Sequence, residues 1–293
     1  MCRGEVVLEN LFRLDGAPTV IGQNGIVPSM SPGDTVANAV FDLRQWKPPA
    51  HWRGKKVTFR NVAFPKIVAR ATFTDCVFED CLFIGTRFRE VEFHGSKFNN
   101  CNFWKSRFHQ VYLDPDSIKL DDRFKVEAPN VGISVFQALL ANFAEERQDE
   151  FYMRADVNFR RWKRYQIPSD IRRKRIGWKS GNAKILKSIV YEYTAGFGYK
   201  PLNFFATTLI LFFSVSVINY YYIGSDVKID GNLTNGASFV DALFYTFSIL
   251  TVLGFSSIVP ATDCAKVLAV FEALVSIGWL GIFSSVLVKR LLR

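Results

Sequence analysis

The segment from residue 239 to residue 260 places polar groups in an apolar environment, where they could bind a ligand or an ion. Its first part, Phe239 to Ile249, is apolar and aromatic and gives about three helical turns, which is too short to cross a bilayer. The chain then turns at Gly254 and returns through Pro260. Because lipid offers no hydrogen bonds, such a segment can lie at membrane depth only if it is buried in protein or lines a water-filled cavity. The pattern therefore indicates a re-entrant loop.

The carboxylate of Glu272 is a second group with chemical potential, since it is the only charge in the apolar run from Val267 to Val288. A lone carboxylate in a membrane span is by default a candidate functional group. The ordinary alternative is a neutral or hydrogen-bonded brace, and we favour that interpretation.

Enzymatic chemistry has little support in the sequence. His51, His94 and His109 lie in an expected N-terminal cap or at outward positions of a repeat. No nucleophile with a nearby base is discernible, and no Cys or His spacing indicates zinc binding. We therefore expect no catalytic residues, no bound cofactor and no enzyme activity.

Two long apolar runs must hold the re-entrant segment in place. The first, residues 202–223, has no charge and ends in three tyrosines, which suit a membrane–water interface. The second, residues 267–288, is followed by Lys289 and Arg290. At about 1.5 Å per residue, both are long enough for a hydrocarbon core of about 30 Å. Buried helices of a soluble core are the alternative, and membrane spans are favoured.

The placement of Lys and Arg predicts the orientation of the spans. The connecting loop carries only Lys228 and Lys266, whereas basic residues crowd the outer flanks of both spans. The positive-inside rule then places both termini in the cytoplasm of a multi-pass protein of the plasma (inner) membrane. Segments expected to face anionic lipid headgroups contain many of the basic residues behind the net charge of +10. Nucleic acid is therefore not an expected partner.

The re-entrant segment resembles the pore of two-span potassium channels, whose filter has the sequence T-T-V-G-Y-G-D followed by an apolar pair and Pro. Without gaps, this motif aligns with residues 251–260. The resemblance implies a homotetramer that conducts a monovalent cation, with potassium the first expectation. It also implies that backbone carbonyls line the ion path, namely those of Thr251, Val252, Leu253, Gly254 and Phe255.

Four positions depart from the family pattern. Val252 lacks the hydroxyl of the second filter Thr, and Ser256 replaces a Gly that adopts a positive φ at little cost. Ser257 removes the carboxylate that braces the filter, and Ser248 stands where many relatives have Glu in the pore helix. We therefore expect a wider or more mobile filter with weakened potassium selectivity.

The second span also resembles the inner helix of this family through FEALVSIGWLGIF. Glu272 matches a glutamate near the filter and is expected, with Ser248, Ser256 and Ser257, to support it. The family's hinge glycine falls at Ser276, with Gly278 and Gly281 nearby. These positions predict either a gating hinge or close helix packing through small residues.

Phenylalanines recur every five residues between Phe73 and Phe108, with a small or slim residue two positions before each. Neither a helical nor a strand period explains this spacing. It resembles the pentapeptide-repeat family, a right-handed four-sided β-helix with twenty residues per coil. The resemblance implies roughly three coils with Phe73 under Phe93 and equivalent stacks above Phe78, Phe83 and Phe88. Cys76, Cys81 and Cys101 take the slim inward position and are expected to be free thiols.

The predicted fold is mixed. It comprises an N-terminal cap region (1–56), a pentapeptide-repeat β-helix (57–113), cytoplasmic and juxtamembrane helices (114–200) and a two-span pore domain (201–293). Spacings of three, four and seven between Ser134 and Tyr165 indicate one long or two consecutive amphipathic helices.

Two hypotheses for function remain open. The first is a tetrameric cation channel, in which the repeat domain senses a ligand or holds the subunits together. The second is a non-conducting membrane scaffold that binds a cytoplasmic protein partner through the repeat domain, which Val252 and Ser256 favour. Ion flux separates them.

Overall fold

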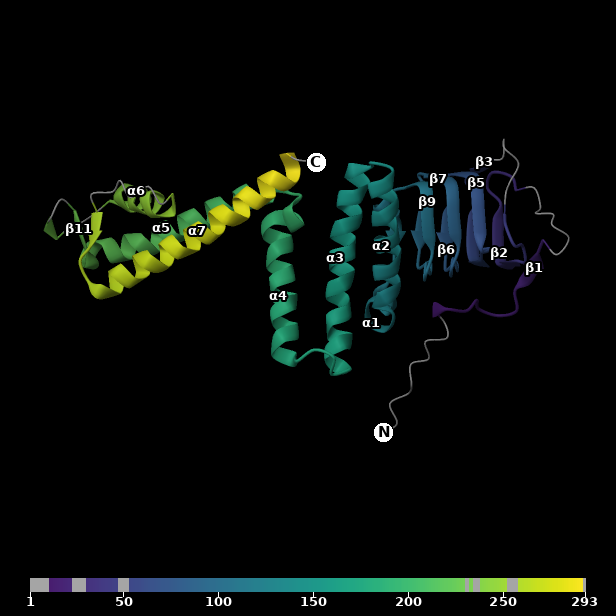
Figure 1. Ribbon diagram of the computed structural model, residues 1–293, viewed down its shortest axis with the longest axis horizontal. Coiled ribbons are helices and arrows are strands. Elements are labelled where there is room, and N and C mark those ends of the chain that lie inside the picture. The colour runs from purple at the N-terminus through teal and green to yellow at the C-terminus, as the bar shows by residue number, and fades with distance from the viewer. Residues whose placement is uncertain are drawn as a thin grey trace. The chain divides into compact units, whose positions relative to one another are not determined.

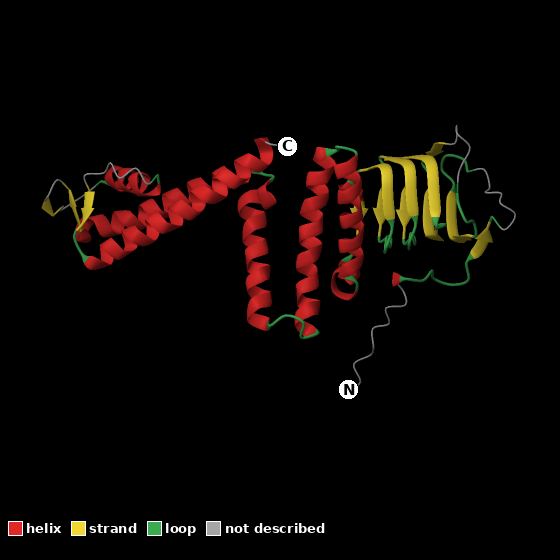
Figure 2. Ribbon diagram, viewed as in Figure 1, coloured by secondary structure: helices red, strands yellow, loops and turns green. Residues whose placement is uncertain are grey.

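The computed structural model describes residues 11–22, 30–46, 53–229, 232–233, 238–251 and 258–291. The chain divides into two compact units, Met1–Ser188 and Ile189–Arg293. The first unit contains parallel strands followed by helices, and the second contains two long helices with a short one between them (Figures 1 and 2).

The first unit is built on a β-solenoid of about four coils, one more than expected. Every strand in its two sheets pairs in parallel with the next coil. One sheet contains β1 (Thr19–Ile21), β2 (Thr35–Phe41), β4 (Thr58–Ala63), β6 (Val77–Glu79), β8 (Lys97–Asn99) and β10 (Ile118–Lys119). The other contains β3 (Arg53–Lys55), β5 (Ile67–Thr74), β7 (Arg87–His94) and β9 (Arg107–Leu113).

The phenylalanine columns form the core of the solenoid and confirm the predicted stacks. Ring centroids lie 5.0 Å apart for Phe73 and Phe93 and 4.7 Å apart for Phe78 and Phe98. The pair of Phe83 with Phe103 and the pair of Phe88 with Phe108 are also stacked. Stacked rings of this kind bury large apolar area at each coil. The interior is therefore filled by side chains.

Backbone corners between strands explain the polar residues that interrupt the repeat. Asp75, Asp80, Glu90, Asn100 and Gln110 all have φ between 51° and 54°. Asn and Asp tolerate this left-handed region better than most residues. At these residues the backbone turns from one face of the coil to the next.

The region predicted as an N-terminal cap also contributes strands. β2 pairs with β4 through Thr35 and Thr58, and β3 pairs with β5 through Gly54 and Phe73. These segments lack the five-residue phenylalanine spacing, so their sequence did not reveal them. They extend the two sheets by pairing the edges that the first repeat coil would otherwise expose.

Helices close the opposite end of the solenoid. After β9 come the 3₁₀ turn η2 (Pro115–Ser117), α1 (Asp122–Glu127), α2 (Pro129–Glu145) and α3 (Asp149–Arg172). The Asn142 side chain accepts from the backbone N–H of Val111 at 3.0 Å and donates to its carbonyl at 2.8 Å. One amide thereby satisfies both main-chain groups of an edge residue, as a further strand would. Of the two alternatives predicted for this stretch, one long helix or two consecutive ones, the structure shows two helices, α2 and α3.

The second unit holds the two candidate membrane spans. α4 (Trp178–Ala195) leads into a turn, η3 (Gly196–Gly198), and then α5 (Pro201–Asp226). α6 (Phe239–Leu250) and α7 (Asp263–Leu291) follow, and strands β11 (Val227–Ile229), β12 (Asn232–Leu233) and β13 (Ile258–Pro260) form a small antiparallel sheet between the helices. Residues Pro201–Tyr221 and Asp263–Val286 are long and apolar enough to span a membrane.

The two long helices expose most of their apolar side chains. Only 11 % of the apolar window of each is buried within the chain, which is not the behaviour of a soluble core helix. On α5, Leu202, Ile210 and Tyr221 are exposed, and on α7, Val267 and Leu274 are. Together with their length, this exposure identifies a membrane protein.

Candidate functional site

α6 is a short apolar helix with a well-defined start. Ser238 Oγ accepts from the backbone N–H of Asp241 at 3.2 Å, and Asp241 Oδ2 accepts from the backbone N–H of Ser238 at 2.8 Å. This reciprocal capping box satisfies two main-chain donors at the helix start. At the other end, Thr251 Oγ1 donates to the carbonyl of Phe247 at 2.7 Å. α6 therefore ends immediately before the predicted filter sequence.

A buried polar cluster, Asn219, Thr246, Glu272 and Ser276, joins α6 to both long helices. Asn219 Nδ2 on α5 donates to Thr246 Oγ1 on α6 at 3.0 Å and to Glu272 Oε2 on α7 at 3.2 Å. Ser276 Oγ donates to the main-chain carbonyl of Glu272 at 2.7 Å. All four residues are less than a tenth exposed. Because buried polar groups are costly without partners, the cluster fixes how the three helices pack.

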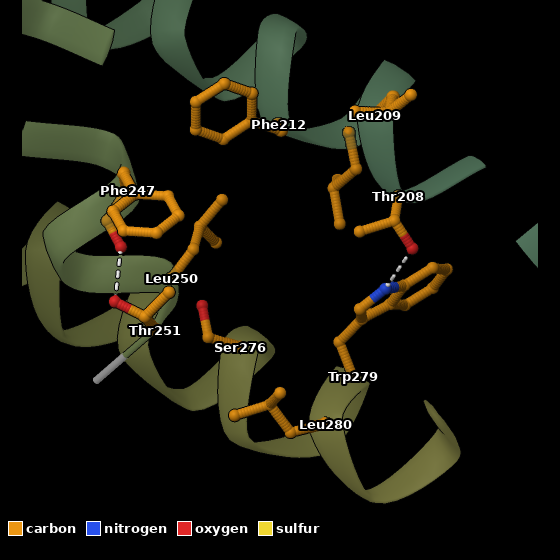
Figure 3. A pocket seen from close by; sticks show the side chains of 10 residues that line it. Thr208, Leu209, Phe212, Phe247, Leu250, Thr251, Ser276, Trp279 and Leu280 are labelled. Carbon is orange, nitrogen blue, oxygen red and sulfur yellow. Dashed lines mark hydrogen bonds between the residues drawn. The ribbon is translucent and has the colours of Figure 1, made fainter. Parts of the chain in front are cut away.

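An apolar cavity of 340 Å³ lies between the same three helices (Figure 3). At one wall, Trp279 Nε1 on α7 donates to Thr208 Oγ1 on α5 at 2.8 Å. Thr251 at the end of α6 and Ser276 on α7 also face this space. The remaining lining residues are Leu209, Leu211, Phe212, Phe247, Leu250 and Leu280.

Comparison with protein families assigns the second unit. Residues 204–293 match the family model described as "Ion channel". This part of the chain is therefore similar to ion-channel domains. Residues 70–114 match the family model for pentapeptide repeats in nine copies. Both predicted resemblances are confirmed, and no curated protein matches the chain.

Only the first predicted filter residue of the ion-channel domain lies in the described part of the chain. Thr251 terminates α6 and is partly exposed. Val252, Leu253, Gly254, Phe255, Ser256 and Ser257 lie outside the described residues. Their predicted roles therefore remain predictions that rest on the sequence resemblance.

The described support residues of the ion-channel domain lie behind that position. Ser248 is 2 % exposed on α6, and Glu272 is 6 % exposed on α7. Glu272 accepts a hydrogen bond from Asn219, which is the geometry of the hydrogen-bonded brace that we favoured. The structure thus brings Glu272 together with the pore helix through Asn219.

The predicted hinge residues of the ion-channel domain lie along one unbroken helix. Ser276 is buried and bonds one turn back along α7. A Cβ added at Gly278 or Gly281 would meet no atom within 4 Å. Within the described residues, these two glycines are therefore not sites of close packing between helices of one chain.

Sequence reasoning missed Asn219, Thr246 and Thr208. Asn219 was within the first predicted span, where a buried amide is unusual and marks an interhelical contact. That signal could have identified it. Its partners could not have been assigned, because Asn219 and Glu272 are separated by 53 residues and meet only through helix packing.

Proposed function

We propose that the chain is one subunit of a homotetrameric cation channel with a filter at Thr251–Ser256. The observation that carries this proposal is the placement of α6. A helix too short to span a membrane is hydrogen-bonded to Asn219 of one candidate span, which in turn donates to Glu272 of the other, and the helix ends at the first filter residue. A plain two-span anchor does not need this arrangement.

The orientation of α6 supports a cationic permeant ion, with potassium the first candidate. The carboxyl end of a helix carries a partial negative charge of about half an elementary charge, which stabilises nearby cations. α6 ends at Leu250, directly before the filter sequence. Four such helix ends, together with main-chain carbonyls of Thr251 to Phe255, would replace part of an ion's hydration shell.

The proposed assembly lies in the plasma (inner) membrane with both termini in the cytoplasm. Exposed apolar side chains on α5 and α7 support contacts with lipid and with neighbouring subunits. The basic residues on the outer flanks of both spans support the orientation. The solenoid would then be cytoplasmic, where it could hold the subunits together or bind a protein partner. Neither role requires enzymatic chemistry.

Ion flux tests the proposal. Liposomes containing the full chain and loaded with potassium should release it down a gradient when a counter-ion path is provided. The control is a variant, Gly254→Val, which adds a branched side chain at the predicted turn of the filter and keeps Asn219, Thr246 and Glu272 in the sequence. Flux from the wild-type chain and none from the variant supports conduction through the filter. Equal flux from both, or none from either at any voltage or ionic composition, contradicts it.

The alternative is a non-conducting scaffold that uses the repeat domain to bind a protein partner. Val252 and Ser256 favour it, because both replace residues that potassium filters use for conduction. Silent liposomes that hold correctly inserted protein would support this second function.

A further inference from the structure

The outward face of the last two solenoid coils holds a basic cluster of Arg87, Arg89, Arg107 and His109. β7 and β9 pair in parallel with Arg87 opposite Arg107 and Arg89 opposite His109. Between them, Phe88 and Phe108 point inward and stack at 5.1 Å. The alternation of a strand therefore places all four basic side chains on one outer face.

The spacing of the cluster brings like charges close together. Neighbouring strands lie about 4.8 Å apart, and residues two apart on a strand about 6.7 Å. Like charges directly opposite each other on neighbouring strands are destabilising. Arg87 and Arg107 occupy such positions, so their repulsion carries an electrostatic cost that a bound anion would reduce.

Two other outward arginines of the solenoid, Arg60 and Arg70, are paired with acids. Arg60 contacts Glu79 at 2.8 Å, and Arg70 contacts Glu90 at 3.1 Å. Within the described part of the chain, Arg87, Arg89 and Arg107 form no ion pair. The nearest acids are already engaged, since Glu90 pairs with Arg70 and Glu145 lies 3.5 Å from His109 Nδ1. The three arginines of the basic cluster therefore differ from Arg60 and Arg70, whose charges are balanced by a neighbouring acid.

A polar hollow of 480 Å³ lies over the basic cluster. Its polar lining consists of Arg87, Arg89, Glu90, Arg107, His109 and Gln110. The hollow is large enough for a small multivalent anion, and guanidinium groups reach into it from both coils. Arginine is suited to such ligands because its planar fork binds phosphate oxygens in pairs.

We propose that the basic cluster binds an anion carrying two or more phosphate groups. Guanidinium groups on two neighbouring strands about 4.8 Å apart match two linked phosphates better than one. The ligand is either a free phosphate compound or the headgroup of a phospholipid, and the chemistry of recognition is the same for both. The inference concerns the solenoid alone and stands independently of ion conduction.

Protection of the guanidinium groups from phenylglyoxal tests the proposal. The full chain in detergent is treated with the reagent at low ionic strength, with and without inorganic pyrophosphate, and modified arginines are mapped by mass spectrometry. A second arm uses the chain in nanodiscs of phosphatidylcholine, with and without phosphatidylinositol bisphosphate. Arg60, which is paired with Glu79, is the internal control.

Protection of Arg87 and Arg107 but not Arg60 by pyrophosphate supports a free phosphate ligand. Protection only by the phosphoinositide supports a lipid headgroup. Calorimetric affinity for the protecting ligand should fall about tenfold or more in Arg87→Gln/Arg107→Gln and stay unchanged in Arg60→Gln. Equal modification in every condition overturns the proposal, whatever the stability of the variants.

Discussion

The side-chain amide of Asn219 donates hydrogen bonds to two acceptors on two different helices. Thr246 also donates to the carbonyl of Ala242, so its hydroxyl keeps a partner without Asn219. Glu272 is in a different position, because the described contacts of its carboxylate depend on Asn219. A buried charge that loses its partner carries the larger penalty. At the residue scale, the stability of the channel domain therefore depends on the contact between Asn219 and Glu272.

We expect Asn219→Leu to destabilise the ion-channel domain by about 1–3 kcal/mol, because it removes the hydrogen-bond donor to the Glu272 carboxylate. Thermal unfolding of the full chain in nanodiscs measures the effect. Ser214→Ala is the matched control, because Ser214 lies exposed on the same helix and its hydroxyl donates to the carbonyl of Ile210 one turn earlier. The double variant Asn219→Leu/Glu272→Leu should recover most of the loss, and a double variant less stable than either single one would contradict the assignment.

The buried thiols of the solenoid predict a pH dependence of stability. Burial raises the pKa of Cys76 and, to a greater extent, that of Cys101. Below the ordinary thiol pKa of about 8.5, both states keep the proton and the stability is complete. Above it, the unfolded chain ionises while the folded chain does not, so the free energy of unfolding falls as pH rises. The loss is at most about 1.4 kcal/mol per pH unit for each thiol.

Replacement by serine provides the control for this effect. Ser96 occupies an equivalent inward position and donates to the carbonyl of Phe73, so the repeat accepts serine there. Cys76→Ser/Cys101→Ser should fold and show a shallower decline in urea stability between neutral and alkaline pH. An unchanged slope would show that other groups control the pH dependence.

At the element scale, the repeat was predictable and the strands before it were not. A phenylalanine every five residues has one structural explanation, so its stacking could be deduced from Phe73 onwards. β2 and β3 carry no such spacing and are defined by pairing with later strands. The candidate site was predictable to the same extent. The sequence placed a short apolar helix close to the observed bounds of α6, but the contact between Asn219 and Glu272 depends on how the helices pack and could not be read from the sequence.

The junction between α2 and α3 depends on a residue with no side chain. A Cβ at Gly132 would lie 2.1 Å from the Trp162 ring. Alanine ordinarily stabilises a helix by about 1 kcal/mol relative to glycine. At Gly132 the steric overlap with Trp162 must outweigh this gain, so that the substitution destabilises the fold. We expect Gly132→Ala to lower the stability of the first unit by about 1–3 kcal/mol in urea unfolding.

Gly177→Ala is the matched control for that substitution, because an added Cβ there would meet no atom within 4 Å. It should leave the unfolding midpoint almost unchanged. Trp162→Phe should partly restore the stability of Gly132→Ala, since the smaller ring leaves room for the methyl group. An equal loss in the Gly132 and Gly177 variants would remove the packing explanation.

At the scale of the whole molecule, we propose separate functions for the channel domain and the solenoid. The pore helix is held by polar contacts inside the second unit, while the solenoid has a filled interior and a basic outer face. Val252, Ser256 and Ser257 are the sequence departures from potassium filters, and they predict weak discrimination among monovalent cations.

Currents across a planar bilayer with potassium on one side and sodium on the other test the central claim most directly. We predict unitary cation currents from the full chain that reverse closer to zero than a potassium-selective pore would. Val252→Thr/Ser256→Gly should move the reversal potential toward that of potassium. Absence of current from correctly inserted protein would contradict the channel assignment, and strong potassium preference in the wild-type chain would contradict weakened selectivity.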